Sequence, residues 1–172
     1  TLIGLASSGL HTNGYSLARK IVFEVAGLAC GDPMPGVGRT VGEALMEPHR
    51  SYAKVISILS KIVPIKGMAH ITGGGITDNL PRALPEDMSA EVELGSWEVP
   101  PVFRFLKDCG NVAPMEMMRT FNMGVGYIVV VSRENVSAAI KALTQGGENP
   151  AIIGRVIKGD NKVQYTGSLR YA

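Results

Sequence analysis

The stretch 124-GVGYIVVV-131 carries the strongest strand signal in the chain. Its second half is apolar at every position and rich in β-branched residues, which is typical of a strand buried on both faces. Two further apolar runs, LIGLA at 2–6 and IKGMAHI at 65–71, also read as buried strands. Helical patterns separate these runs, so the sequence predicts an architecture in which strands and helices alternate.

Helices are predicted where apolar residues recur every three or four positions. The first begins at Asn13 or Gly14 and stops at Gly27, and a capping-box pattern of Thr40 and Glu43 opens a short second helix. The other predicted helices cover 48–63, 76–84, 100–109, 114–121 and 132–145. Pro81 predicts a break or kink in the helix at 76–84.

Three more strands complete the predicted fold. Residues 90–94 alternate like a half-buried strand, and residues 151–157 and 162–165 are predicted to form a hairpin through the turn at 159–161. No repeat, low-complexity tract or internal linker is visible. The sequence therefore predicts one α/β or α+β domain over residues 1–172, built around a single mixed sheet.

The composition fits one folded domain and excludes several classes of protein. Of the 172 residues, 45% are hydrophobic and 19% are charged, which excludes intrinsic disorder. A formal net charge of +2 gives no general affinity for polyanions, so nucleic-acid binding is not predicted. The longest strongly apolar stretch, 126–131, is far shorter than the ~20 residues that span a bilayer, and no signal peptide is visible. We therefore expect no membrane association. Two distant cysteines, Cys30 and Cys109, favour a reducing, cytoplasmic setting.

The first residues suggest that the chain is part of a longer protein. Thr1 is followed at once by a strand pattern, whereas natural N-termini usually begin with frayed polar residues. We therefore expect a further segment before Thr1, and removal of an initiator methionine is the alternative.

The segment SSGLHTNG at 7–14 lies between a predicted strand and a predicted helix. Such a junction presents unpaired backbone N–H groups and the positive end of the helix dipole, which suit a phosphate. Ser7 and Ser8 add hydroxyl donors, and Gly9 permits close approach. The alternative is a plain turn in which Asn13 caps the helix.

The segment HITGGG at 70–75 occupies a similar junction. Three consecutive glycines cost chain entropy, so they favour a place where backbone contacts something such as a phosphate. The segment matches neither the P-loop nor the dinucleotide-binding spacing, and a tight turn is the alternative. His70 would be either a satisfied core histidine or a donor, acid or base at the ligand.

The segment RTFNMGVG at 119–126 leads into the strongest strand. Arg119 could pair with a carboxylate or phosphate and Asn122 could recognise an amide or hydroxyl. The alternative is a helix end with Arg119 on the last carbonyls and Asn122 in a turn.

Metal-dependent and serine hydrolases are not predicted. His11, His49 and His70 show no metal-ligand spacing, the cysteines form no CxxC pair, and no Gly-x-Ser-x-Gly elbow occurs. The sequence therefore gives no metal site.

Taken together, these segments resemble the phosphoribosylformylglycinamidine cyclo-ligase family, also called aminoimidazole ribonucleotide (AIR) synthetase. The likeness runs from Leu2 to about Ile157 and implies the C-terminal domain of that enzyme, a three-layer α/β/α sandwich with a mixed sheet that is partly ferredoxin-like. The matching segments, in order, are SSGLHTNGYSL at 7–17, AHITGGG at 69–75, NLPRALP at 79–85 and RTFNMGVG at 119–126.

The resemblance implies an ATP-dependent ligase of purine synthesis. Its substrate would be formylglycinamidine ribonucleotide (FGAM), whose formyl oxygen is activated as a phosphate ester before a ring nitrogen attacks; AIR, ADP and phosphate leave. ATP and Mg²⁺ would be bound mainly by an N-terminal domain of the same polypeptide, which in the family also forms a homodimer. No acid-rich segment of that kind occurs in this chain.

The resemblance also implies roles for the motif residues. His11, Asn13 and His70 would face the reacting amidine or the transferring phosphoryl group as catalytic residues, and Arg119 and Asn122 would line the same cleft. The residues expected to hold the ribose phosphate are Ser7, Ser8, Gly9, Thr72, Gly73, Gly74 and Gly75. The family often has Thr in place of His49 and Cys in place of Met123, so His49 has no assigned role and a required thiol at 123 is not expected.

Other members of the same superfamily are the alternatives within this class. They are the amidotransferase that makes FGAM and the selenophosphate, hydrogenase-maturation and thiamine-phosphate kinase relatives, all with the same two-domain plan. The segment 119–126 favours AIR synthetase. An alternative of another class is a phosphate-binding or scaffolding module with no activity of its own; ATP turnover by the chain alone would distinguish the two, and none is expected.

Overall fold

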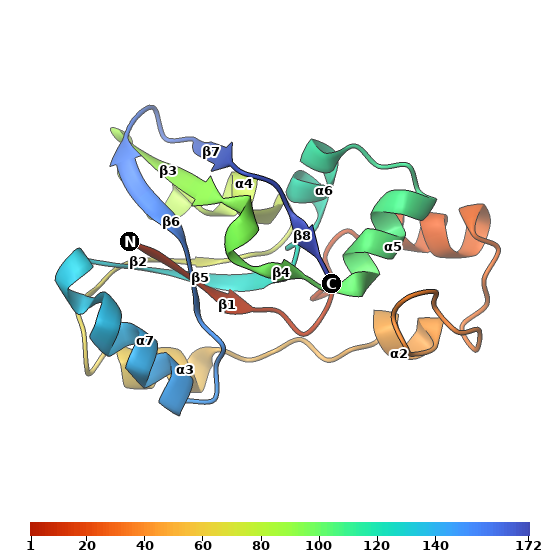
Figure 1. Cartoon of the computed structure of the whole chain (residues 1–172), viewed down its shortest axis with the longest axis horizontal. Coiled ribbons are helices and arrows are strands. Elements are labelled where there is room, and N and C mark those ends of the chain that lie inside the picture. Colours follow the sequence, from red (N-terminus) through yellow and green to blue (C-terminus); the bar gives the residue numbers. More distant parts are fainter.

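The computed structural model describes all 172 residues and contains a six-stranded mixed sheet (Figure 1). The strand order is β2-β5-β1-β6-β3-β7, and every neighbouring pair is antiparallel except β3 and β7. The six strands are β1 (Leu2–Ala6), β2 (Ile65–His70), β3 (Met88–Glu93), β5 (Val125–Val131), β6 (Ala151–Lys158) and β7 (Val163–Thr166). As its composition predicts, β5 is an interior strand, between β2 and β1.

Seven α-helices surround the sheet, and a second, two-stranded sheet pairs β4 (Glu98–Val99) with β8 (Arg170–Tyr171). The helices are α1 (Tyr15–Arg19), α2 (Val41–Leu45), α3 (Ala53–Leu59), α4 (Gly75–Asn79), α5 (Pro101–Cys109), α6 (Pro114–Thr120) and α7 (Val136–Gln145). A π-helix at Lys20–Val25 continues α1, and 3₁₀ turns lie at Pro81–Ala83, Leu94–Ser96 and Arg133–Asn135. No helix is long and apolar enough to cross a membrane.

Helices cover both faces of the sheet, because successive strand residues point to opposite sides. On one face, Ile3 of β1 and Val129 of β5 pack in a cluster with α3 and α7, which lie together below the sheet in Figure 1. On the other face, Leu2 and Ile128 belong to a larger cluster that includes residues of the remaining five helices. The three-layer α/β/α arrangement is therefore confirmed.

Several local predictions are also confirmed. The capping box of Thr40 and Glu43 opens α2, and α4 ends before Pro81, which starts a 3₁₀ turn. Pro114 stands at the first position of α6. Gly14, with a φ of 67°, rather than Asn13, precedes α1. Sequence reasoning did not foresee the π-helix or the β4–β8 pair.

The predicted hairpin at 151–165 is wrong. Strand β6 pairs with β1 and β3, whereas β7 pairs in parallel with the far edge of β3. The turn at 159–161 therefore passes around β3, where Gly159 N–H donates to Asp87 O and Ala90 N–H donates to Lys162 O. A turn sequence alone cannot show that a third strand lies between its arms.

The predicted helix at 48–63 is also too long. Helix α3 begins only at Ala53 and ends at Leu59. The residues before it are held by tertiary hydrogen bonds: Ser8 Oγ donates to Pro48 O at 2.7 Å, and Tyr52 Oη donates to Ala6 O at 2.7 Å. These contacts hold the segment 48–52 against the end of β1.

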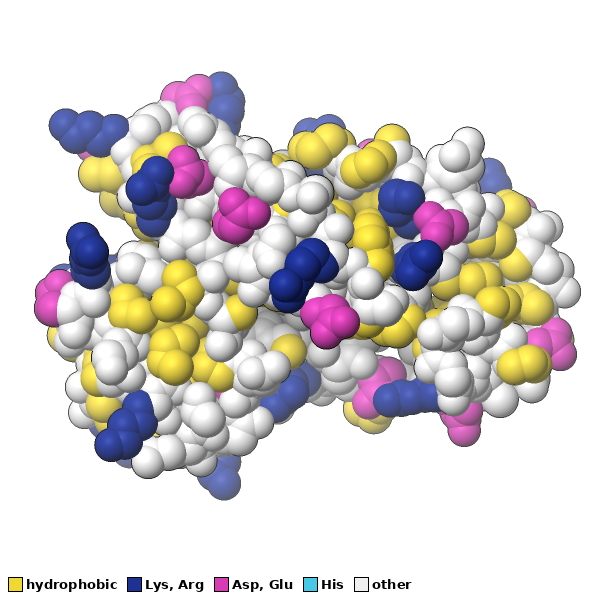
Figure 2. All heavy atoms as spheres, viewed as in Figure 1, with side chains coloured by type: hydrophobic (Ala, Val, Ile, Leu, Met, Phe, Trp, Pro, Cys, Tyr) yellow, Lys and Arg dark blue, Asp and Glu magenta, His cyan; other side chains and the backbone are white.

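The topology brings the three motif segments to one edge of the sheet. Strands β1 and β2 are both antiparallel to β5, so their C-terminal ends meet the N-terminal end of β5. The loops 7–14 and 71–74 and the segment 121–124 leave the sheet at these ends. Charged side chains of both signs are interspersed on the face shown in Figure 2, in keeping with the small net charge.

Candidate active site

Asn122 connects the first loop to the third. Its side chain is fully buried, and Oδ1 accepts hydrogen bonds from Ser7 Oγ at 2.9 Å and Gly124 N–H at 2.8 Å. Its Nδ2 donates to Gly9 O at 2.8 Å. Because these bonds engage both ends of the amide, Asn122 positions the loop 7–9, and Ser7 Oγ is already used within the protein.

Asn79 holds the segment 72–75, here called the glycine loop, through hydrogen bonds to its backbone carbonyl groups. Its Nδ2 lies 3.1 Å from Gly73 O and 2.8 Å from Gly75 O, both of which accept. Gly75 has a φ of 60°, and a Cβ there would overlap the carbonyl oxygen of Met118 in α6. Gly75 is therefore needed for the packing of α4 on α6, a contact with protein rather than with a ligand.

The preceding residues of the loop offer free donors. The backbone N–H groups of Thr72, Gly73 and Gly74 donate to no protein acceptor. Gly73 is exposed, and a Cβ built on it meets nothing within 4 Å. Successive free N–H groups of this kind suit an anion such as phosphate.

Three histidines distant in sequence form one cluster, here called the histidine cluster: His11, His49 and His70. The Nε2 atoms of His49 and His70 are 3.1 Å apart, and the ring centroids of His11 and His49 are 4.0 Å apart. Tyr127 stacks on His70 with a centroid distance of 6.0 Å, and Tyr52 lies 5.2 Å from Tyr127. All of these residues except His11 line a cavity of about 380 Å³.

His11 is the buried member of the cluster, with 2% of its surface exposed. Its Nε2 accepts a hydrogen bond from Ser8 N–H at 3.0 Å, so the neutral ring carries its proton on Nδ1, which has no partner. Burial lowers the pKa of His11 to about 4, with smaller contributions from the other two histidines and Arg50. His11 is therefore neutral at pH 7.

His70 is exposed, so the alternative of a core histidine is excluded. Partial burial, and secondarily the nearby His49, lower its pKa below the ordinary value. At pH 7 the ring is mainly neutral and able to accept a proton. Since the two Nε2 atoms are within hydrogen-bond distance, one of the two rings donates to the other.

The segment that carries His49 is held on both sides of that residue, by Pro48 on one side and by Arg50 and Tyr52 on the other. Arg50 Nη2 lies 3.1 Å from Glu148 Oε2, a carboxylate that is almost completely buried, and 3.2 Å from Gly147 O. The Tyr52–Ala6 hydrogen bond also lies on this C-terminal side of His49, and the Ser8–Pro48 hydrogen bond lies on the N-terminal side. Neither Tyr52 nor Glu148 was identified from the sequence as a site residue. For Tyr52 a signal was available, because it is the one tyrosine in an otherwise aliphatic helical stripe.

The structure separates the remaining predicted residues. Asn13 Nδ2 donates to Ile71 O at 3.5 Å and so links the first two loops. Arg119 is exposed and lines a different cavity, with Arg82 and Lys162. Thus the histidine cluster, the glycine loop and Asn122 come together, and Arg119 does not lie with the histidines.

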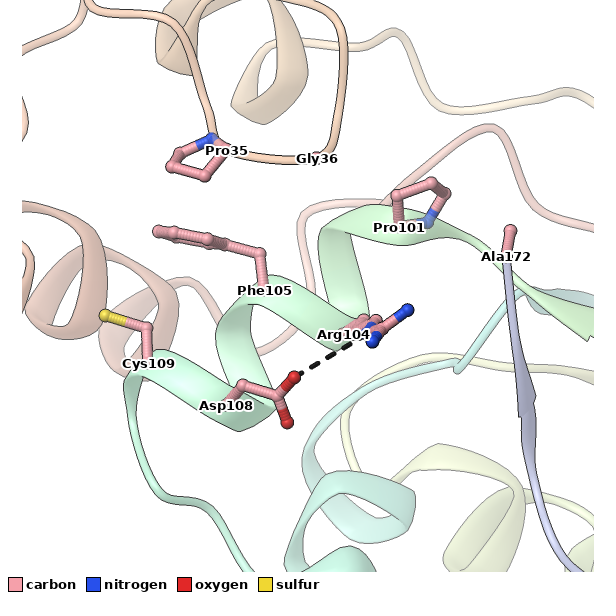
Figure 3. A pocket seen from close by; sticks show the side chains of 8 residues that line it. All are labelled: Pro35, Gly36, Pro101, Arg104, Phe105, Asp108, Cys109 and Ala172. Carbon is pink, nitrogen blue, oxygen red and sulfur yellow. Dashed lines mark ion pairs between the residues drawn. The ribbon is translucent and has the colours of Figure 1, made fainter.

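A further cavity of about 350 Å³ lies beside α5 (Figure 3). Phe105 faces Pro35 across it, and Arg104 pairs with Asp108 at 3.7 Å. It contains none of the predicted site residues and no candidate acid–base pair other than this ion pair.

No three His, Cys, Asp or Glu side chains are arranged to hold a metal ion. Mg²⁺ prefers carboxylate oxygens and waters. The two carboxylates near the candidate site are separate: Glu148 pairs with Arg50, and Asp78 lies beside Gly74, so the site offers no set of ligands for a Mg²⁺ ion.

Comparison with known proteins identifies relatives over almost the whole chain. Residues 1–166 match the family described as AIR synthase related protein, C-terminal domain. The phosphoribosylformylglycinamidine cyclo-ligase of Alkaliphilus oremlandii is 44% identical over 162 residues, and that of Caldanaerobacter subterraneus subsp. tengcongensis is 46% identical over 162 residues. Each match covers 94% of this chain and 48% of the relative, so the chain spans about half the length of these curated relatives.

A solved structure with the same fold is that of the thiamine-monophosphate kinase from Stenotrophomonas maltophilia K279a. It superposes with a TM-score of 0.64 over 96% of this chain and 50% of that one. The two sequences are 14% identical, so this likeness concerns the fold alone.

Proposed function

Because this chain belongs to the family of AIR synthase related proteins, C-terminal domain, we propose that it forms the substrate side of an ATP-dependent cyclo-ligase. The reaction is the conversion of FGAM to AIR, with ADP and phosphate as the other products, which is the activity implied by the names of its relatives. The observation that supports it best is that a loop with free N–H groups and the histidine cluster meet at one edge of the sheet.

In this proposal the glycine loop binds the ribose phosphate of the substrate. The N–H groups of Thr72, Gly73 and Gly74 donate to it, while Asn79 holds the loop carbonyls away from the anion. Ser7, Ser8, Gly9 and Gly75 support the site through contacts within the protein. In this proposal these four residues support the structure of the site, whereas the resemblance implies that they bind the ribose phosphate.

The proposed acid–base group is His70. Ring closure requires the attacking nitrogen to lose a proton, and a neutral imidazole at the cavity is suited to accept it. A hydrogen bond between His49 Nε2 and His70 Nε2, which are 3.1 Å apart, holds the ring of His70 in place. The buried His11 remains neutral. Asn13 joins the two loops on which His11 and His70 lie. When bound, ATP supplies the phosphoryl group that activates the formyl oxygen.

We further propose that residues 1–172 form one domain and that an N-terminal domain of the same polypeptide binds most of the Mg²⁺–ATP and forms a homodimer. The candidate site has no set of three side chains arranged to hold Mg²⁺, which supports this division. A cytoplasmic location suits the proposed small-molecule substrate and the two free thiols of Cys30 and Cys109.

The first test is calorimetric titration of the chain with FGAM and, separately, with Mg²⁺–ATP. Gly73→Asp places a carboxylate in the glycine loop without backbone strain, and Gly73→Ser is the matched neutral control. We expect FGAM to bind to the wild type and to Gly73→Ser, binding to be lost in Gly73→Asp, and Mg²⁺–ATP to bind weakly. Tight Mg²⁺–ATP binding without FGAM binding would overturn the proposed division.

The second test measures turnover in the full-length protein. His70→Ala should lower kcat by a factor of about 10² or more, the range of general acid–base catalysis. His49→Thr, the residue that the family often carries, should retain most of the activity. An unchanged kcat in His70→Ala would remove this residue from the chemistry.

Two alternatives remain distinguishable by the same assays. The second candidate is a related phosphoryl-transfer activity, which the shared fold of the thiamine-monophosphate kinase favours. If it is correct, the chain should bind thiamine phosphate rather than FGAM. A phosphate-binding module without activity would bind FGAM normally while His70→Ala in the full-length protein changes no rate.

A further inference from the structure

A second polar cavity, of about 530 Å³, lies beside α4 and shares no residue with the cavity of the histidine cluster. Three segments build its walls: α4 with the 3₁₀ turn that follows it, the end of α6, and the turn that leads into β7. Its lining residues are Thr77, Asp78, Pro81, Arg82, Arg119, Asn161, Lys162 and Val163. Only one of the eight is hydrophobic, so the cavity is suited to a polar ligand.

The charges in this cavity are mainly positive. Arg82, Arg119 and Lys162 come from three different segments, and Asp78 is the one acidic residue of the lining. Neither arginine forms an ion pair, whereas Lys162 pairs with Asp160 on the exposed turn. An anion bound in this cavity would be attracted by all three cationic groups that line it.

Hydrogen bonds within the protein join the segments that form the walls of this cavity. Asn161 adopts a left-handed conformation, with a φ of 59°, and its Nδ2 lies 3.1 Å from Pro81 O and 3.1 Å from Pro85 O, both of which accept. Thr77 Oγ1 lies 2.8 Å from Tyr165 Oη, which ties α4 to β7. These bonds hold the two segments that carry Arg82 and Lys162 against each other, so binding of a ligand orders the two side chains but not the backbone of the cavity.

We propose that this cavity is a second anion site, separate from the glycine loop, which binds a phosphate group through Arg82 and Arg119. The planar guanidinium groups match phosphate oxygens in pairs, and Lys162 adds a point charge. Arg119 therefore serves this site rather than the cleft of the histidine cluster. The inference does not depend on the proposed cyclo-ligase activity, because it concerns direct binding by other residues.

The test is direct binding to the 172-residue chain by ³¹P NMR or calorimetry at low salt. The probes are ribose 5-phosphate and inorganic tripolyphosphate, which represent a sugar phosphate and the phosphates of a nucleotide. The variants are Arg82→Gln and Arg119→Gln, and Arg104→Gln is the matched control, an exposed arginine in the cavity of Figure 3. All three side chains are exposed, so each variant should fold.

We expect each of the two cavity variants to raise the Kd of the preferred probe about tenfold and Arg104→Gln to leave it unchanged. Gly73→Asp should also leave this Kd unchanged, which separates this site from the glycine loop. Tighter binding of tripolyphosphate indicates nucleotide phosphates as the ligand, and tighter binding of ribose 5-phosphate indicates a sugar phosphate. Equal Kd values in the wild type and both cavity variants, or no binding at millimolar concentrations, would overturn the proposal.

Discussion

At the scale of single residues, the candidate site depends on side chains whose hydrogen bonds are all made within the protein. Asn122 is the clearest example, since its amide makes three hydrogen bonds to the loop 7–9 and the start of β5. Asn122→Ala leaves the N–H of Gly124 and the carbonyl of Gly9 buried without their partner. We expect a loss of about 3 kcal/mol in the free energy of unfolding, measured by urea denaturation.

The matched control for Asn122 is Asn149→Ala. Asn149 is exposed and its side chain makes no hydrogen bond within the protein, so the loss there should stay below about 0.5 kcal/mol. Equal losses in the two variants would show that the hydrogen bonds of Asn122 do not stabilise the loop.

His11 makes the stability of the chain depend on pH. Its pKa is lowered to about 4 in the folded protein, chiefly by burial, so between pH 6.5 and pH 4 the unfolded chain binds more protons. Stability must therefore fall as the pH is lowered through this window. Between pH 7 and pH 5 we expect a loss of about 2 kcal/mol from His11, to which the lowered pKa of His70 adds in the same direction.

Urea denaturation of the wild type and of His11→Gln at pH 7 and pH 5 tests this expectation. The variant will be less stable at pH 7, but its stability should change less between the two pH values. The carboxylates with lowered pKa values, Glu43, Glu134 and Asp160, titrate below this range and do not obscure it. The same pH dependence in both proteins would contradict the assignment to His11.

At the scale of elements, the three glycines at 73–75 have different functions. Gly75 combines a φ of 60° with contact against the backbone of α6, whereas Gly73 is open and has no positive φ. Gly75→Ala should therefore cost more than about 3 kcal/mol or prevent folding, and Gly73→Ala should cost less than about 0.5 kcal/mol, as measured by thermal unfolding. Similar melting temperatures in the two variants would show that α4 does not need Gly75 to pack on α6.

The elements also show how far the sequence predicts the fold. The strands at 2–6, 65–71 and 124–131 and the periodic helices were identifiable because their patterns are local. The prediction that the strand at 65–71 is buried is wrong, because β2 lies at the edge of the sheet and alternate residues are exposed. The pairing of β7 with β3 was not identifiable from the sequence, because β3 lies some seventy residues before β7 in the chain. The predicted start of a helix at residue 48 was wrong for a similar reason. Tertiary hydrogen bonds of Ser8 and Tyr52 hold residues 48–52 in another conformation.

The candidate site was predictable to a similar extent. Glycine runs and histidines at strand ends are visible in the sequence, and the topology confirms that they converge. The grouping of His49 with His70 and the separation of Arg119 depend on side-chain directions, which spacing does not reveal. Glu148 was missed because its role, an ion pair with Arg50, exists only in the folded chain.

At the scale of the whole molecule, two apolar clusters lie on opposite faces of one sheet. Strands β1 and β5 contribute side chains to both of them, so neither layer can be lost without exposing the central strands. The histidine site lies at the edge of these same strands. We therefore expect the chain to unfold in a single transition, with the two helical layers stabilising the site together.

Trp97, the single tryptophan, reports on this cooperativity because it belongs to the larger cluster. Leu59→Ala removes a fully buried side chain of α3 from the smaller cluster, on the other face, at an expected cost of about 3 kcal/mol. If the layers unfold together, the midpoint of the Trp97 fluorescence transition falls as far as that of the far-ultraviolet circular dichroism. Ile58→Ala, at an exposed neighbouring position of α3, is the matched control and should shift neither midpoint appreciably. A Trp97 midpoint that stays at the wild-type value in Leu59→Ala, while the circular dichroism midpoint falls, would mean that the α3–α7 layer unfolds independently of the sheet.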